Sequence, residues 1–229
     1  MLSSVARQTV RMEPALTQAV LGPRDVVVAT GPDAQTYLHS QISQSLDGIE
    51  VGEQRWTFVL DPTGKIISLA RVTRRADDEF ALDTDAGFGD EMLARLQRFK
   101  LRVDADLVLE PAAADASAVD DAARVAAGWP RMGAELIPGE TLVAGTGLAG
   151  IAVSFTKGCY PGQELVERMD SRGADAPRSL RRVPAPEIAA AGDQVVVDGG
   201  EVGTYTTVAG GQALAWIKRG IELGEVIEH

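Results

Sequence analysis

Residues 54–74 read QRWTFVLDPTGKIISLARVTR, two apolar runs separated by the turn Asp61-Pro62-Thr63-Gly64. Proline presets φ in the turn, and glycine adopts backbone conformations that other residues avoid. The stretch therefore predicts a β-hairpin with strands at 54–60 and 65–74. An antiparallel sheet is expected around it.

The segments on either side of this hairpin add strands and helices. The expected elements are a strand at 25–30, a helix from Pro32 through Ile42, an extended piece at 79–83, a helix carrying Met92, Leu93, Leu96 and Phe99 at helical spacing, and a strand at 107–109. Strands mixed with amphipathic helices in this order predict an α+β arrangement, with helices on one face of an antiparallel sheet.

The chain changes character after residue 110. Residues 111–121 read PAAADASAVDD, which predicts a connector leading into a short helix that ends near Gly128. Further on, short β-rich runs separated by paired glycines predict a small β-barrel or sandwich, with strands at 194–197, 202–208 and 213–218. We expect a main region over 1–180, shortened between 111 and 121, and a C-terminal β-barrel over 181–229.

The charge balance disfavours direct nucleic-acid binding. The 229 residues include 33 acids and 22 bases, giving a net charge of −11 and a pI near 4.7. Such a chain lacks the positive field on which non-specific nucleic-acid binding depends. No apolar run approaches the ~20 residues that span a bilayer, so no membrane partner is expected. Arg7 and Arg11 faintly suggest a transit peptide, but Glu13 and Pro14 interrupt it, and an ordinary N-terminal segment is expected.

The cysteine and histidine content argues against a metal site. A single cysteine, Cys159, excludes an intramolecular disulfide and a multi-thiol metal cage supplied by one chain. His39 and His229 lack a second ligand at helical spacing, and Asp77-Asp78-Glu79 is typical of a solvated loop. We expect no bound metal and a reducing compartment, the cytoplasm.

The densest group of reactive side chains is KGCYPGQE, residues 157–164. Pro161 is placed to open a helix, so that Cys159 lies just before a helix N-terminus with Lys157 nearby. Both features stabilise a thiolate, which makes Cys159 a candidate reactive cysteine. The alternative is a half-buried small hydrophobe in a helix-capping loop.

This stretch resembles the signature Lys-Gly-Cys-Tyr-x-Gly-Gln-Glu of the YgfZ family of folate-binding proteins, relatives of the glycine-cleavage T-protein (aminomethyltransferase). Further resemblance covers most of the chain: residues 31–34 with Tyr37-Leu38, residues 60–65, Arg124 with Gly128 and Pro130, Arg168, and Arg172-Gly173. It implies a T-protein-like (GcvT-like) fold with a folate channel and a C-terminal β-barrel. It also implies a role in assembling or maintaining iron–sulfur enzymes, tRNA-thiolating ones among them.

The resemblance also implies the site. Cys159 and Lys157 would be the catalytic residues, and a tetrahydrofolate or a derivative would be the cofactor. Its expected contacts are Gly158, Tyr160, Gly162, Gln163, Glu164, Arg168 and Arg172. Gln163 and Glu164 would supply or brace the pterin donors and acceptors, and Arg168 or Arg172 would meet the glutamate tail. The implied partners are folate and iron–sulfur proteins or cluster-assembly factors.

Two departures from the family leave alternatives open. Ser68 and Leu69 stand about where the T-protein carries paired aspartates, so aminomethyl transfer by that mechanism is not expected. The 111–121 connector replaces strands that relatives carry, which would leave the folate channel open on one side. The alternatives are a tetrahydrofolate-dependent one-carbon transferase and a non-catalytic scaffold that has lost folate binding.

Overall fold

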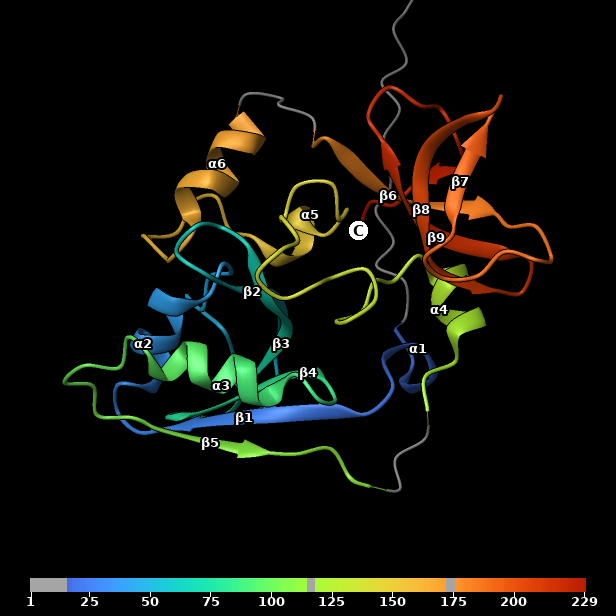
Figure 1. Ribbon diagram of the computed structural model, residues 1–229. Coiled ribbons are helices and arrows are strands. Elements are labelled where there is room, and N and C mark those ends of the chain that lie inside the picture. The colour runs from blue at the N-terminus through green and yellow to red at the C-terminus, as the bar shows by residue number, and fades with distance from the viewer. Residues whose placement is uncertain (1–15, 115–117, 172–175) are drawn as a thin grey trace, which may run out of the picture.

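The computed structural model describes residues 16–114, 118–171 and 176–229, and it contains two antiparallel sheets (Figure 1). The first sheet has the order β2-β3-β4-β1-β5. Its strands are β1 (Arg24–Thr30), β2 (Gln54–Leu60), β3 (Ile66–Ala76), β4 (Glu79–Asp85) and β5 (Asp106–Glu110). All pairs are antiparallel, and the predicted α+β class is confirmed.

The predicted hairpin is the β2–β3 pair, which runs from Gln54 opposite Thr73 to Leu60 opposite Ile66, with a shift of register between Val59 and Leu60. Its turn is held by the Asp61 carboxylate, which accepts hydrogen bonds from the backbone N–H groups of Thr63 and Lys65 at 2.8 and 2.9 Å. Gly64 has φ +85°, which explains why a glycine ends the turn. The hairpin prediction is confirmed.

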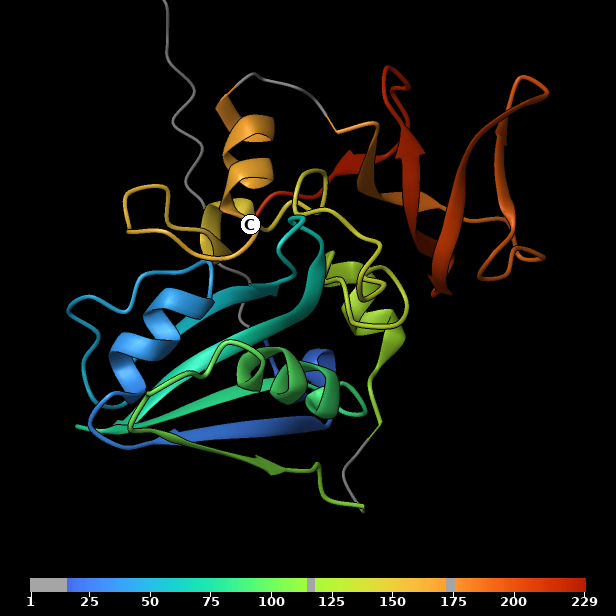
Figure 2. The same ribbon diagram turned by 60° about the vertical axis from the view of Figure 1, so that its left-hand side comes forward.

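Helices α2 (Ala34–Gln41) and α3 (Gly89–Gln97) cover one face of this sheet (Figure 2). Leu38 of α2 and Met92 and Leu96 of α3 are fully buried against strand residues such as Val27 and Phe80. Both helices differ from the predicted bounds. Pro32 precedes α2 by two residues, and α3 ends before Phe99.

The opposite face of the first sheet packs against loops and short helices. These helices are α1 (Gln18–Leu21), α4 (Asp121–Ala127), α5 (Ala149–Ala152) and α6 (Gln163–Ser171). Trp56 of β2 and Trp129 meet in this layer, with ring centroids 4.6 Å apart. Tyr160 and Val166 belong to the same buried cluster, so the KGCYPGQE stretch is joined to the core.

The chain enters the second sheet at Arg178. This sheet has the order β10-β6-β9-β8-β7, with strands β6 (Arg178–Pro184), β7 (Gln194–Val197), β8 (Gly200–Ala209), β9 (Gln212–Lys218) and β10 (Glu225–Val226). The three predicted strands correspond to β7, β8 and β9. In the described residues no ladder joins the edge strands β10 and β7, so the expected barrel is not closed.

Arg124 of α4 connects the second sheet to the rest of the protein. Its guanidinium is 1% exposed and lies 2.7 Å from the Glu135 carboxylate, which is fully buried. It also donates to the Trp129 carbonyl and to the hydroxyl of Thr207 in β8, and that hydroxyl donates to Glu135. One buried ion pair and its hydrogen bonds thus join α4, the loop that carries Glu135, and β8.

Candidate functional site

The loop from Lys157 to Gly162, here called the signature loop, is held first by Lys157. This side chain is 9% exposed, and its ammonium donates to the backbone carbonyls of His39, Ile42 and Gln44. The last two distances are 2.6 and 3.2 Å. Lys157 therefore donates hydrogen bonds to backbone carbonyls at the carboxyl end of α2 and in the segment that follows it. Its action on the Cys159 thiol stays a prediction.

Burial lowers the pKa of Lys157 from 10.5 to about 8. Between these two values the unfolded chain binds more protons, so the free energy of unfolding should rise with pH in this window. A Lys157→Met variant has no ammonium to titrate, so its stability lacks this pH dependence. The free energy of unfolding of the wild type, relative to that of the variant, should therefore rise by about 2 kcal/mol from pH 7 to 9.5. Urea unfolding of both proteins across this range measures it. Parallel pH profiles would contradict the prediction.

Tyr160 anchors the signature loop in the core. Its side chain is 6% exposed, and its ring centroid lies 5.2 Å from the Lys157 ammonium. Burial, together with the charge of Glu167, raises the pKa of Tyr160 to about 12. Its hydroxyl has no hydrogen-bond partner within the described part of the chain. Tyr160 is therefore a neutral packing residue whose hydroxyl can still accept or donate.

Gly162 provides the third attachment, through close contact with the hairpin turn. It has φ +86°, and a Cβ placed there would lie 2.6 Å from the Asp61 carbonyl oxygen and 2.8 Å from the Gly64 Cα. A Cβ on Gly64 would in turn meet Leu165 at 2.8 Å. The two glycines let the turn that identified the hairpin pack directly on the start of α6.

Between these attachments, Gly158 and Cys159 are exposed. Among the residues that the structure describes, nothing lies within 4 Å of a Cβ placed on Gly158. Cys159 is a free thiol four residues before the first residue of α6. The buried neighbours on both sides fix the backbone, so the thiol is presented to solvent from a rigid loop.

The remaining predicted site residues lie along α6. Gln163 donates to the Glu167 carboxylate at 2.5 Å, and Arg168 forms an ion pair with Glu164. Arg168 and Glu164 are exposed, and these contacts link successive turns of the helix. Arg172, the last predicted contact, lies outside the described residues. The folate roles assigned to these residues stay predictions.

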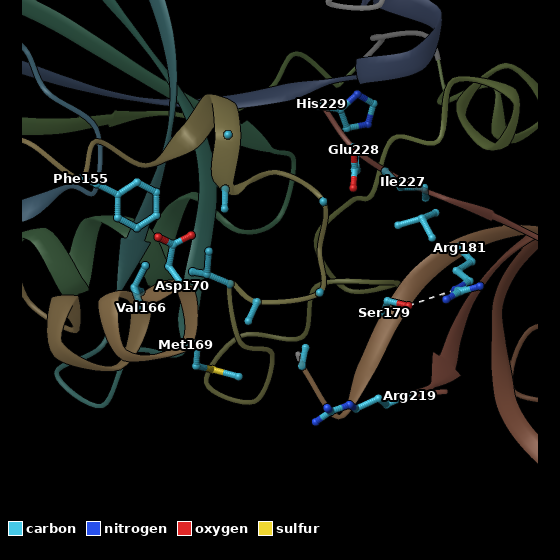
Figure 3. Close-up of a pocket in the computed structure, with 18 of the residues that line it drawn as sticks. Phe155, Val166, Met169, Asp170, Ser179, Arg181, Arg219, Ile227, Glu228 and His229 are labelled. Atoms are coloured by element: carbon cyan, nitrogen blue, oxygen red, sulfur yellow. Dashed lines mark hydrogen bonds between the residues drawn. The ribbon is translucent and has the colours of Figure 1, made fainter. Parts of the chain in front are cut away.

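A cavity of about 610 Å³ lies beside α6, between that helix and the second sheet (Figure 3). Val166, Met169 and Asp170 of α6 line one side, together with Phe155. The other walls come from the 143–150 loop, β6, Arg219-Gly220 and the segment 226–229. Of the predicted folate contacts that the structure describes, none is among the residues lining this cavity. The signature loop and the cavity are thus two neighbouring features that share α6.

The cavity has charged groups at its walls. Asp170 lies on the α6 side, and Arg181 and Arg219 lie on the side of the second sheet (Figure 3). Arg181 donates to Ser179 Oγ at 3.1 Å and to the Leu223 carbonyl at 3.2 Å. Sequence reasoning missed these three residues. Asp170 falls seven positions after Gln163, two turns along the helix, whereas Arg181 lies in a strand that was not predicted.

Two residues of β3, Ser68 and Leu69, stand where the resemblance to the T-protein would place its paired aspartates. Both are buried, and Ser68 Oγ donates to Thr84 Oγ1 at 2.7 Å, so neither position carries a carboxylate.

Over residues 16–114, 118–171 and 176–229, no group of three or more His, Cys, Asp or Glu side chains is arranged to hold a metal ion. No helix in those ranges is long and apolar enough to cross a membrane.

Comparisons with known proteins give two similarities. No protein-family model matches the chain. Over 72 residues, 31% of its length, the chain is 44% identical to the mitochondrial "Iron-sulfur cluster assembly factor IBA57 homolog" of Chaetomium globosum, and this match spans 16% of that protein. The fold resembles glycine cleavage system aminomethyltransferase T from Bartonella henselae, with TM-score 0.72, 15% identity and coverage of 90% of this chain and 83% of the other. The chain therefore has the aminomethyltransferase T fold.

Proposed function

We propose that this protein is an accessory factor for the assembly or maintenance of iron–sulfur clusters, and that it binds a reduced folate. The observation that carries the proposal is the rigid, exposed presentation of Cys159. Lys157, Tyr160 and Gly162 hold the loop to three parts of the core, while the thiol faces solvent. Such a thiol can contact a partner protein or its cluster. The similarity to a cluster-assembly factor supports the same role.

The cavity beside α6 fits a folate in size and chemistry. Its volume of about 610 Å³ falls in the range of small-molecule sites, roughly 300–1,000 Å³. The Asp170 carboxylate can accept the paired N–H groups of a pterin edge, and Arg181 or Arg219 can bind the carboxylates of the glutamate tail. A bound reduced folate supplies a carrier for one-carbon units. The protein's own residues orient it and cover its ring.

Calorimetry with tetrahydrofolate tests the folate site. We expect micromolar binding by the wild-type protein, and at least tenfold weaker binding by Asp170→Asn and by Arg181→Met. Glu187→Gln is the matched control, because Glu187 is exposed, lies outside the cavity lining and should leave affinity unchanged. Wild-type affinity in both cavity variants would place folate elsewhere, and absence of binding would favour the scaffold alternative.

Complementation of a strain deleted for this protein tests the role of the thiol. Cys159→Ser should fail to restore iron–sulfur enzyme activity while retaining wild-type stability, because the side chain is exposed. Any effect on tRNA modification should follow the loss of iron–sulfur enzymes, since the chain carries a net charge of −11. Full restoration by Cys159→Ser would refute the proposal. Turnover of tetrahydrofolate adducts by the purified protein would instead indicate a transferase.

A further inference from the structure

After α3, basic and apolar residues alternate in an exposed loop, Arg98-Phe99-Lys100-Leu101-Arg102, here called the basic loop. Phe99 is 39% exposed and Leu101 is 79% exposed. No hydrogen bond or ion pair within the described residues engages the side chains of Arg98, Lys100 or Arg102. The loop thus offers three cations and two apolar side chains in an acidic protein.

The basic loop has a defined shape. Turn hydrogen bonds run from the Lys100 N–H to the Gln97 carbonyl and from the Leu101 N–H to the Phe99 carbonyl. Arg102 adopts φ +56°, a conformation that costs a non-glycine residue energy. The loop lies at the end of the first sheet opposite to the second sheet (Figures 1 and 2). Because the backbone of the loop is already ordered in this way, ordering the backbone on binding costs little conformational entropy.

Arg95, one turn earlier in α3, adds to the positive potential. It is 6% exposed, and its guanidinium carbon lies 4.7 Å from the Phe99 ring centroid. Its donors reach the Leu60 carbonyl and the Gln41 side-chain oxygen, but no carboxylate, and its Nη2 has no partner in the described part of the chain. A buried cation without a bound carboxylate therefore lies beneath Phe99.

We propose that the basic loop docks a partner protein through a short segment in which Asp or Glu residues are interspersed with Leu or Phe. Carboxylates would pair with Arg98, Lys100 and Arg102, and apolar side chains would cover Phe99 and Leu101. An extended polyanion, such as a nucleic acid or an anionic membrane, would be repelled by the net charge of −11. A short acidic-apolar segment carries few charges, so it meets less of that repulsion while still pairing with the three local cations.

This proposal is independent of the folate cavity, because no residue of the basic loop lines it. The probe is a fluorescein-labelled peptide of sequence DELFEDL, titrated with the full chain at low salt and followed by anisotropy. The neutral peptide NQLFQNL and the apolar-depleted peptide DEAAEDA are the comparisons. We expect DELFEDL to bind at least tenfold more tightly than either, and added salt to weaken its binding.

The variants Arg98→Glu/Lys100→Glu and Phe99→Ala/Leu101→Ala should each weaken binding of DELFEDL at least tenfold. Arg178→Glu, an exposed charge reversal on the second sheet, is the matched control and should bind as wild type. Absence of binding, or equal binding by all variants, would overturn the proposal. So would loop-dependent binding to phosphatidylserine vesicles, or self-association that the Arg98→Glu/Lys100→Glu variant abolishes.

Discussion

Replacement of Arg124 by methionine is expected to lower the free energy of unfolding by about 3–5 kcal/mol. The variant would leave the Glu135 carboxylate fully buried without its cation, and would remove the bonds to Trp129 and Thr207. Because these contacts join α4 to β8, the attachment of the second sheet should also weaken, while the packing of Val125 against Leu180 and Leu214 remains. Urea unfolding followed by circular dichroism measures the loss.

Two further variants make this test specific. Arg168→Met removes an exposed ion pair on α6 and should cost less than about 1 kcal/mol. Combining Arg124→Met with Glu135→Leu should recover part of the stability, since the stranded carboxylate is gone. An equal loss in Arg124→Met and Arg168→Met would show that the buried pair does not carry the attachment.

The second large effect is expected at Gly162. Replacement by alanine places a Cβ 2.6 Å from the Asp61 carbonyl oxygen at a backbone φ of +86°. The backbone of Asp61 and the backbone of Gly162 cannot move apart without disrupting the turn or the start of α6, so the free energy of unfolding should fall by roughly 3 kcal/mol. The hairpin turn would separate from α6, and the position of Cys159 would change. Loss of iron–sulfur enzyme activity in the complementation strain should follow.

Gly158→Ala is the control in the same loop, because nothing lies within 4 Å of its added Cβ. Its stability should stay within about 0.5 kcal/mol of wild type. A variant that is stable but inactive would show that Gly158 takes part in function directly. Equal stabilities of Gly158→Ala and Gly162→Ala would disprove the close contact between the turn and α6.

Local patterns predicted the parts of this fold that depend on neighbouring residues. The turn at 61–64 and the apolar runs on either side of it predicted the β2–β3 hairpin, and paired glycines bounded β7 to β9. Strand β6 was missed, since it carries three arginines and takes its place only by pairing with β9. Its position depends on contacts that no local pattern encodes.

For the candidate site too, the sequence predicted the local features but not the contacts between distant segments. The eight-residue signature identified the loop and its exposed thiol. It could not reveal that Lys157 reaches carbonyls 113 to 118 positions away in the sequence, nor that Gly162 meets Asp61. The cavity was missed for the same reason, because its walls come from α6, a loop, β6 and the last residues of the chain.

Strand β5 has a consequence for the behaviour of the protein in concentrated solution. Within the described parts of the chain it is an edge strand of five residues that pairs only with β1, and Val108 on its outer face is 58% exposed. Such an edge invites strand addition between copies and growth into aggregates. Asp106 and Glu110 place a carboxylate at each end of β5, and the Glu110 carboxylate also lies 3.7 Å from the Arg75 guanidinium. These two carboxylates act as gatekeepers, since a second edge aligned with the first would bring like charges together.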